Sequence, residues 1–382
     1  MLKNAPKSFI FAGGGSGGHL FPGLAVASAL QKIDQNVQIL FLATERPIDS
    51  QILEPTAFKY IPQPIKPIPS LKKPIDIWKF WQSWRQTVHL CRHLLLENPP
   101  QAILGLGGFA SGPALMVASK QLIPTALLNP DAVPGRANRF GRRFSQKIFL
   151  QWESSRPHFG PDAPKCVVTG CPIREMFSEI KNDKPHARKE LGLNPEKRTL
   201  VIMGGSQGGY NVNQAAVECL TNGKIDLKAW QILHLTGNKD KTYALEKYQA
   251  ASITAQVWEF TDKMDKVLQA ADLVVARAGA SSLAEITVVG VPSILIPYPY
   301  HKDQHQLRNA EVLAQFGAAQ IVMDECDKVK TAQNLVKILQ ECQKDKVLSS
   351  MSQAALSLGK KQAAETVARE LINLSVNSIE HQ

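Results

Sequence analysis

The 382-residue sequence lacks the features of several protein classes. No apolar run approaches the roughly 18 residues of a membrane-spanning helix. The first short run, Phe9 to Ala12, leads into glycines instead of a cleavage site, so we expect neither a transmembrane helix nor a signal peptide. The six cysteines form no close pair with the spacing of a metal or redox site. These absences fit a protein of the reducing cytoplasm.

The composition is that of a globular protein with two hydrophobic cores. Hydrophobic residues make up 44% and charged residues 20% of a chain that is too long for one ordinary core. Residues 1–165 hold 19 Lys and Arg against 9 Asp and Glu, whereas residues 166–382 hold 25 against 24. The N-terminal half therefore carries the basic surface. Anionic lipid and nucleic acid are candidate partners for it, and a merely soluble surface is equally compatible.

Apolar strands that run into glycine-rich turns and then helices recur in both halves, at residues 8–12, 102–106, 200–203 and 273–276. Strands that alternate with helices predict the α/β class with parallel sheets, here two Rossmann-like domains. Four prolines between residues 157 and 172 mark the boundary. We expect domains over 1–165 and 166–361, and a terminal helix over about 362–382 that could pack back on the first domain.

The first glycine-rich loop, Gly13 to Gly18, formally contains the GxGxxG pattern of dinucleotide-binding proteins. However, the only acid near the ribose-binding spacing is Glu45, which lies late. His19 follows the glycines at the carboxyl end of the predicted strand, where it could take a proton from an attacking hydroxyl. The alternative is a histidine that caps the start of the helix.

The second loop, Gly204 to Gly209, follows a predicted strand and precedes a helix. Its backbone amides and the Ser206 hydroxyl suit a diphosphate. The loop lacks the Gly-Lys-Ser/Thr ending of a nucleotide triphosphatase, which disfavours ATP hydrolysis. A tight turn without a ligand is the alternative.

A third stretch, residues 277–285, places small residues where a sugar nucleotide could approach the backbone. Glu285 falls on the same helical face as Ser281 and Ser282, where its carboxylate could accept both hydroxyls of a ribose. The alternative is an acidic residue that interacts with the helix dipole. Polar residues then cluster at 301–309, directly after another predicted strand.

The segment Lys66 to Leu96 combines lysine and arginine with tryptophan. Ile77, Trp81, Trp84 and Val88 fall on one helical face, as in a segment that binds an anionic lipid surface. Packing of this face on the core of its own domain is equally compatible. No nucleic-acid recognition motif is present, so we expect no nucleic-acid partner.

The motifs at residues 13–23, 107–113, 204–208, 277–285 and 303–309 occur in the order and spacing of one family. From about Phe9 to Val322 the chain resembles the MurG family, the UDP-N-acetylglucosamine transferases that make lipid II from lipid I in peptidoglycan synthesis. The resemblance implies a GT-B fold, in which two Rossmann-like domains with parallel sheets face a cleft. It implies inverting transfer of N-acetylglucosamine to the 4-hydroxyl of undecaprenyl-pyrophosphoryl-N-acetylmuramoyl-pentapeptide, without a metal or another cofactor.

The resemblance also implies that the two domains bind different substrates. The first domain would bind the acceptor and an anionic membrane through residues 66–96, at the cytoplasmic face of the inner membrane, with cell-wall synthesis proteins as further partners. The second domain would bind UDP-N-acetylglucosamine. His19 would be the base, Phe260 would lie against uracil, and Glu285 would hold the ribose. The other donor-side positions are Ser16, Gly17, Gly18, Arg174, Ser206, Gln207, Ala280, Ser281, Ser282, His305, Gln306 and Asn309. The acceptor-side positions are Phe109, Ser111, Asn129, Asp131 and Asn138.

The chain departs from the family pattern on the acceptor side. Leu128 to Asp131 replace the usual His-Glu-Gln-Asn run, Phe109 replaces a tyrosine, and Cys171 replaces an asparagine. Two alternatives therefore stay open: a related GT-B transferase that acts on another lipid or glycan, and a catalytically silent UDP-sugar-binding protein. A role for Asp131 as a second acid-base group also stays open.

Overall fold

The computed structural model describes residues 7–67, 69, 74–177, 179–180, 183–205, 209–300 and 303–379. The chain forms two compact units, one of Met1–Glu175 with Lys361–Gln382 and one of Met176–Lys360. The division lies after Glu175, beyond the expected boundary at 165/166. The reason is that β7 (Cys166–Val168) pairs with β6 (Lys147–Leu150) and extends the N-terminal sheet.

The N-terminal unit contains a seven-stranded parallel sheet in the order β3-β2-β1-β4-β5-β6-β7. Its other strands are β1 (Ser8–Gly13), β2 (Gln38–Thr44), β3 (Lys59–Gln63), β4 (Ala102–Gly107) and β5 (Thr125–Asn129). Its helices are α1 (Gly17–Ile33), α2 (Pro47–Leu53), α3 (Pro74–Glu97), α4 (Ser111–Lys120), α5 (Arg136–Gly141) and α14 (Ala363–Ile379). Short 3-10 helices span Arg142–Phe144 and Glu153–Lys165, and a third, Glu175–Phe177, lies at the division.

The central strands of this sheet are buried on both faces. Every residue of β1 after Ser8 is buried, as is every residue of β4 and β5. Parallel strands covered by helices on both sides need consecutive apolar side chains, and these runs supply them. Ile10 and Phe11 accordingly belong to two different core clusters, one on each face.

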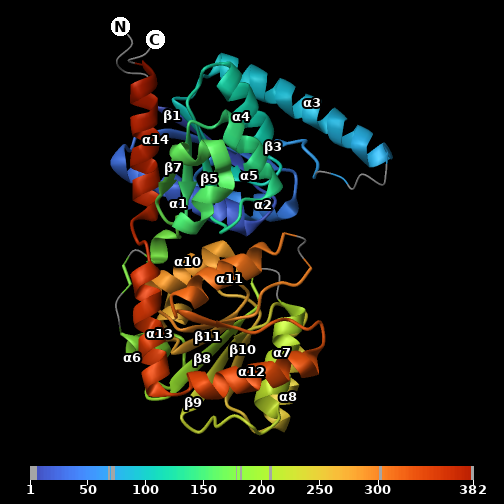
Figure 1. Cartoon of the computed structure of the whole chain (residues 1–382), viewed down its shortest axis with the longest axis vertical. Coiled ribbons are helices and arrows are strands. Elements are labelled where there is room, and N and C mark those ends of the chain that lie inside the picture. Colours follow the sequence, from blue (N-terminus) through green and yellow to red (C-terminus); the bar gives the residue numbers. More distant parts are fainter. Residues whose placement is uncertain are drawn as a thin grey trace. The chain divides into compact units, whose positions relative to one another are not determined.

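The chain's last helix belongs to the N-terminal unit. Val367, Ala368, Leu371 and Leu374 of α14 lie in the same core cluster as Phe11. Figure 1 shows α14 beside the strands of this unit, next to α1. Residues from both ends of the chain therefore make up one core.

The C-terminal unit contains a six-stranded parallel sheet in the order β10-β9-β8-β11-β12-β13. Its strands are β8 (Arg198–Met203), β9 (Trp230–Leu235), β10 (Ala255–Trp258), β11 (Leu273–Ala276), β12 (Ser293–Leu295) and β13 (Ala319–Ile321). Its helices are α6 (Lys184–Glu190), α7 (Tyr210–Thr221), α8 (Lys241–Ala250), α9 (Met264–Ala270), α10 (Ala280–Val289), α11 (His305–Gln315), α12 (Lys328–Cys342) and α13 (Asp345–Leu358).

Both sheets reverse their strand order at one point, between β1 and β4 in the first and between β8 and β11 in the second. Loops at the carboxyl ends of two such strands diverge, and open α/β sheets bind ligands in the space they leave. The four glycine-containing segments of the sequence follow these four strands. The fold therefore places one candidate ligand site at the carboxyl end of each sheet.

Candidate active site

His19 lies in the first turn of α1, directly after the first glycine-rich loop. Its Nδ1 is 3.0 Å from Ser16 Oγ and 3.2 Å from the carbonyl oxygen of Gly14. A proton on Nδ1 that is donated to this carbonyl leaves Nε2 as the proton-accepting nitrogen of the neutral ring. The ring is half-buried and packs against Gly107, where an added Cβ would lie 3.2 Å from His19 Cδ2. The loops after β1 and β4 thus meet at this imidazole.

Asp49, on α2, anchors this loop, and the sequence reasoning missed it. The fully buried carboxylate accepts hydrogen bonds from the Gly15 amide at 2.8 and 2.9 Å. It also accepts from the amide and hydroxyl of Thr44 at 2.8 and 2.6 Å. An acid four residues after Glu45, in the first turn of the helix that follows β2, was the available signal. Its partner Gly15 is 34 residues distant, so no local pattern reveals the contact.

Three acceptor-side residues lie at the carboxyl end of β5. Asn138 Nδ2 donates to Asn129 Oδ1 at 2.9 Å, and Asn129 Nδ2 donates to the carbonyl of Asp131 at 2.7 Å. Asn138 Oδ1 is buried and has no hydrogen-bond partner among the residues described. A Cβ at Gly107 would lie 3.2 Å from both this oxygen and the His19 ring, so the two groups flank the same glycine.

The other acceptor-side residues fall on the loop after β4. Ser111 is buried, and its hydroxyl donates to the carbonyl of Gly108 at 2.9 Å. Phe109 is half-buried, with the Arg46 guanidinium 5.4 Å from its ring centroid. Ser111 shapes the loop by holding its backbone, and Phe109 supplies an aromatic face beside the first loop.

Arg174, expected on the donor side, lies within the N-terminal unit. Its guanidinium is 5.4 Å from the centroid of the Phe21 ring, one turn of α1 beyond Gly17 and Gly18. The structure therefore places Arg174 with the first loop, together with the donor-side residues Ser16, Gly17 and Gly18.

The donor-side residues of α10 form the start of a helix. Gly279 precedes the helix with an extended backbone and no side-chain cap. The first turn, which includes Ala280, Ser281 and Ser282, lies at the positive end of the helix dipole, which favours an anion. Glu285 lies one turn later and is 7% exposed. This arrangement suits a diphosphate beside a hydroxyl-bearing group.

Three further donor-side residues lie at the start of α11. Asp303 Oδ1 and His305 Nδ1 are 2.8 Å apart. Gln306 Oε1 accepts a hydrogen bond from the Tyr298 amide at 3.0 Å, and buried Asn309 donates from Nδ2 to the carbonyl of Ala278 at 3.1 Å. Gln306 and Asn309 therefore hold the backbone that follows β12 and β11.

Phe260 follows β10 and exposes 77% of its surface, which leaves an aromatic face open to a planar ligand. Ser206 and Gln207 lie outside the described residues. The glycines that flank them lie close together, because a Cβ at Gly209 would be 2.8 Å from the Gly204 Cα. Gly204, just after β8, therefore packs against Gly209, just before α7.

Arg277 and Asp324 form a buried ion pair in the C-terminal unit. The sequence did not reveal that these two residues interact. Arg277 Nη2 lies 2.8 Å from Asp324 Oδ2. A charged residue directly after an all-apolar strand was the available signal for Arg277, but nothing local pointed to its partner. Elsewhere in the described residues, no group of three or more His, Cys, Asp or Glu could hold a metal ion.

The aromatic face expected on α3 is partly buried and partly exposed. Trp84 is partly buried and packs edge-on against Phe140, with ring centroids 5.7 Å apart. Trp81 and Trp78 are 55% and 65% exposed. Figure 1 shows the first turns of α3 projecting away from the sheet of their unit. Lys72 and Lys73 lie outside the described residues. Within the part of the chain that the structure covers, no helix is long and apolar enough to cross a membrane.

Comparisons with known proteins agree with this geometry. The glycosyltransferase family 28 N-terminal domain matches residues 9–150 and the C-terminal domain matches residues 199–367. A protein of Desulforamulus reducens named UDP-N-acetylglucosamine--N-acetylmuramyl-(pentapeptide) pyrophosphoryl-undecaprenol N-acetylglucosamine transferase is 34% identical, over 94% of this chain and 96% of its own length. The same-named protein of Geobacter sulfurreducens is 33% identical, over 95% and 97%.

Solved structures show the same fold. The crystal structure of Acinetobacter baumannii MurG is similar with a TM-score of 0.76 and 25% identity, covering 96% of this chain and 100% of that one. A UDP-GlcNAc 2-epimerase from Neisseria meningitidis, solved with UDP-GlcNAc bound, has a TM-score of 0.67 at 14% identity, covering 96% and 100%. At that identity the second likeness concerns the fold alone.

Proposed function

The chain belongs to glycosyltransferase family 28 and to the N-acetylglucosaminyltransferase family of those curated relatives, and from this premise we propose its reaction. The protein transfers N-acetylglucosamine from UDP-N-acetylglucosamine to the 4-hydroxyl of undecaprenyl-pyrophosphoryl-N-acetylmuramoyl-pentapeptide, the lipid I to lipid II step of peptidoglycan synthesis. The observation that carries this proposal is an identity of about one third along nearly the whole chain, across both units.

In the N-terminal unit, His19 is the general base. The attacking hydroxyl forms a bond to the anomeric carbon, the bond from that carbon to UDP breaks, and the hydroxyl proton passes to His19 Nε2. The contact of His19 Nδ1 with the Gly14 carbonyl supports the tautomer in which Nε2 accepts this proton. The unpartnered Asn138 Oδ1 beside Gly107 can accept a hydrogen bond from an acceptor hydroxyl. These contacts support a base and a substrate-orienting amide in one loop cluster.

In the C-terminal unit, the donor is held by groups of different chemistry. The exposed Phe260 ring stacks on the uracil, and Glu285 accepts hydrogen bonds from the ribose hydroxyls. The first amides of α10 bind the diphosphate, whose negative charge grows as UDP departs. Charge on the leaving group is thus stabilised by backbone dipoles, without a metal in the proposed scheme.

The test is UDP release by purified protein supplied with UDP-N-acetylglucosamine and lipid I. His19→Ala should lower kcat by about 100-fold or more, because a positioned base contributes that much to a proton transfer. His158→Ala, which alters an exposed histidine of the same unit, is the matched control and should leave kcat unchanged. Donor binding without any transfer by the wild type would contradict the proposed reaction, and a fully active His19→Ala variant would exclude His19 as the base.

The altered Leu128–Asp131 stretch bears on the acceptor. Leu128 is 1% exposed and belongs to the core of the sheet, and Asn129 is fully buried between Asp131 and Asn138. The side chains of Leu128 and Asn129 therefore shape the end of β5. Mass analysis of the product distinguishes a muramoyl-peptide acceptor from another lipid or glycan.

The first turns of α3 are the membrane-binding surface in this proposal. Ile75, Trp78 and Trp81 are exposed, and exposed Lys79 and Arg85 accompany them. Tryptophan with basic residues on a projecting helix supports an interface with anionic lipid. In the proposal, the protein is peripheral at the cytoplasmic face of the inner membrane.

Sedimentation with vesicles tests this surface. The Trp78→Ala/Trp81→Ala double variant should bind vesicles of phosphatidylglycerol and phosphatidylcholine several-fold more weakly than wild type. Phe260→Ala, which removes an equally exposed aromatic ring from the other unit, should bind them unchanged. Equal vesicle binding by wild type and the double variant would contradict the assignment.

A further inference from the structure

The guanidinium of Arg277 contacts several groups at once. Nη1 donates to the carbonyls of Ile296 and Pro297 at 3.0 and 3.1 Å, and Nη2 pairs with Asp324. The guanidinium also lies 5.5 Å from the centroid of the Tyr298 ring. The Arg277 side chain is 9% exposed. One residue at the end of β11 therefore fixes the backbone after β12 and the carboxylate after β13.

Asp324 extends this set to the start of α7. Its side chain is fully buried and accepts from Asn211 Nδ2 at 3.1 and 3.2 Å, and from the Cys326 amide at 3.0 Å. Asn211 is the second residue of α7, and Gly209, just before this helix, packs against Gly204. The ion pair thus connects the start of α7 to the segment that leads into α10.

The same segments carry the residues already placed on the donor side. Asn309 holds Ala278, the neighbour of Arg277, and Gln306 holds Tyr298, which packs on the guanidinium. All of these contacts lie at the carboxyl end of the C-terminal sheet. One buried charge pair therefore ties together the start of α7 and the segments after β11, β12 and β13.

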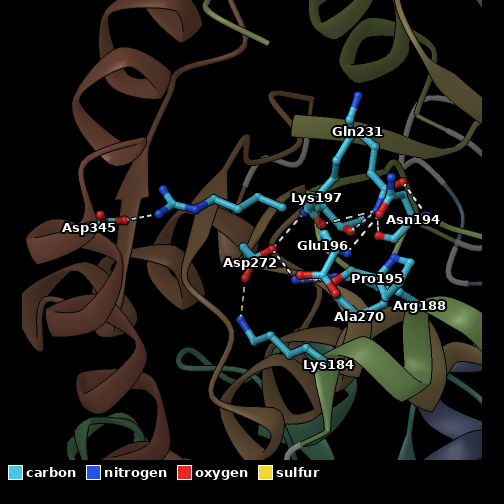
Figure 2. A network of polar contacts seen from close by, with 12 residues as sticks. Lys184, Arg188, Asn194, Pro195, Glu196, Lys197, Gln231, Ala270, Asp272 and Asp345 are labelled. Carbon is cyan, nitrogen blue, oxygen red and sulfur yellow. Dashed lines mark hydrogen bonds and ion pairs between the residues drawn. The ribbon is translucent and has the colours of Figure 1, made fainter. Parts of the chain in front are cut away.

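A second buried pair in this unit provides a comparison. Arg188 Nη2 lies 2.6 Å from Asp272 Oδ2, and Asp272 also accepts from Lys184 Nζ at 2.8 Å and from the Thr199 amide at 2.7 Å. Figure 2 shows this network gathered around Asp272. Asp272 precedes β11, so this pair lies at the amino end of the strands, opposite to the donor-side residues of this unit.

Stability alone does not account for the pair at the carboxyl end. Burying two charges costs several kcal/mol in desolvation, and apolar residues of similar volume stabilise a core as well or better. What an arginine offers instead is a planar fork that fixes several acceptors in one geometry. We propose that Arg277 and Asp324 are positioning residues that align the start of α7 with the first turn of α10 for a nucleoside diphosphate-sugar. This inference rests on the proposed function.

The test compares the two pairs in transfer kinetics with UDP-N-acetylglucosamine. Arg277→Lys keeps the charge but cannot reach two carbonyls and a carboxylate together, and should raise KM for the donor about tenfold or more. Arg188→Lys makes the same change at the amino end and should leave KM within twofold, although both variants lower Tm. A purely structural role for Arg277 predicts equal losses of Tm and unchanged KM in both.

A milder variant keeps the test decisive if Arg277→Lys fails to fold. Asn211→Ala breaks the link to Asp324 without leaving a buried charge unpaired, and should raise KM for the donor at least threefold with kcat altered less. Unchanged donor KM in an active, folded Asn211→Ala variant would overturn the inference. Absence of transfer by the wild type would instead contradict the proposed function, so the two failures are distinct.

Discussion

At the carboxyl end of the N-terminal sheet, Asp49 accepts hydrogen bonds from Gly15 and Thr44, whereas at the same end of the C-terminal sheet Asp324 accepts from Arg277 and Asn211. The first carboxylate is satisfied by backbone amides and a hydroxyl. The second is neutralised by a cation that also holds two carbonyls. Sheets with the same order of their first six strands thus position their loops by different chemistry.

The difference has a steric consequence. Gly14 has φ +154°, and a Cβ there would lie 2.2 Å from Asp49 Oδ2. Gly279 has an ordinary φ of −72°, and nothing lies within 4 Å of the Cβ it lacks. The first loop is glycine-rich because the protein fills the space around it. The space beside Gly279 is not filled by its own unit, as expected where a ligand approaches the backbone.

Replacing these two glycines tests the contrast and should give the largest effect. Gly14→Ala should lower the free energy of unfolding by about 3 kcal/mol or more, because a rigidly bonded, buried carboxylate cannot move aside. Gly279→Ala should cost less than about 1 kcal/mol, since alanine is only a poorer residue than glycine before a helix. Denaturant titration measures both. Equal losses of stability would show that the two loops are packed alike.

Donor kinetics of the second variant sharpen the comparison further. Gly279→Ala should raise KM for UDP-N-acetylglucosamine while leaving the protein folded, because the added methyl occupies space reserved for the ligand. An unchanged KM would mean that this space is not used by the donor.

The units also differ in continuity. The C-terminal unit is one stretch of chain, whereas the N-terminal unit includes α14 from the far end of the sequence. Lys147 of β6 forms an ion pair with Glu370 of α14, but both side chains are 28% exposed, and such pairs contribute little. Apolar contacts of Leu371 and its neighbours must therefore hold the helix.

Truncating one α14 side chain tests that dependence. Leu371→Ala should cost about 2–4 kcal/mol, since a fully buried leucine loses both its transfer free energy and its packing. Val376→Ala on the same helix is the control, because Val376 is 48% exposed and should change stability by less than about 0.5 kcal/mol. Calorimetry should show the loss in the transition of the N-terminal unit. A shift confined to the other transition would contradict the placement of α14.

Local patterns in the sequence predicted the strands and the turns that follow them. An apolar run indicates a short buried strand, and the glycine cluster after it indicates the turn. The His19 loop and residues 280–285 accordingly fall where the α/β pattern put them, at the carboxyl ends of β1 and β11. The anchors of these loops could not be predicted. Asp49 and Asp324 each bind a residue far away along the chain, and only the packed sheets bring such residues together.

Helical spacing predicted only in part which residues of α3 are buried. It grouped Trp81 with Trp84, yet Trp84 packs on Phe140 while Trp81 is exposed. Three residues subtend about 60° around a helix, and the edge of a buried face falls within that angle. Which side of the edge a residue occupies depends on α5, which the α3 sequence does not contain.

The last contrast between the units concerns pH. In the C-terminal unit, burial lowers the pKa of His234 to about 3. Its Nδ1 lies 3.0 Å from the Tyr248 hydroxyl and its Nε2 lies 3.2 Å from Asn213 Oδ1, and Asn213 in turn donates to Asp240. The neutral ring satisfies both neighbours when Nε2 donates to the amide oxygen and Nδ1 accepts from the hydroxyl. A second proton would have no acceptor.

The pKa of an unfolded histidine is near 6.5, whereas the pKa of folded His234 is about 3. Between these two pH values the unfolded state therefore binds a proton that the folded state does not bind. Stability of the C-terminal unit should therefore be complete above about pH 6.5 and fall by up to about 1.4 kcal/mol per pH unit below it. His234→Gln should remove this slope relative to wild type, whereas His158→Gln in the N-terminal unit should keep it. Parallel pH profiles of wild type and His234→Gln between pH 7 and 5 would show that His234 is not the source.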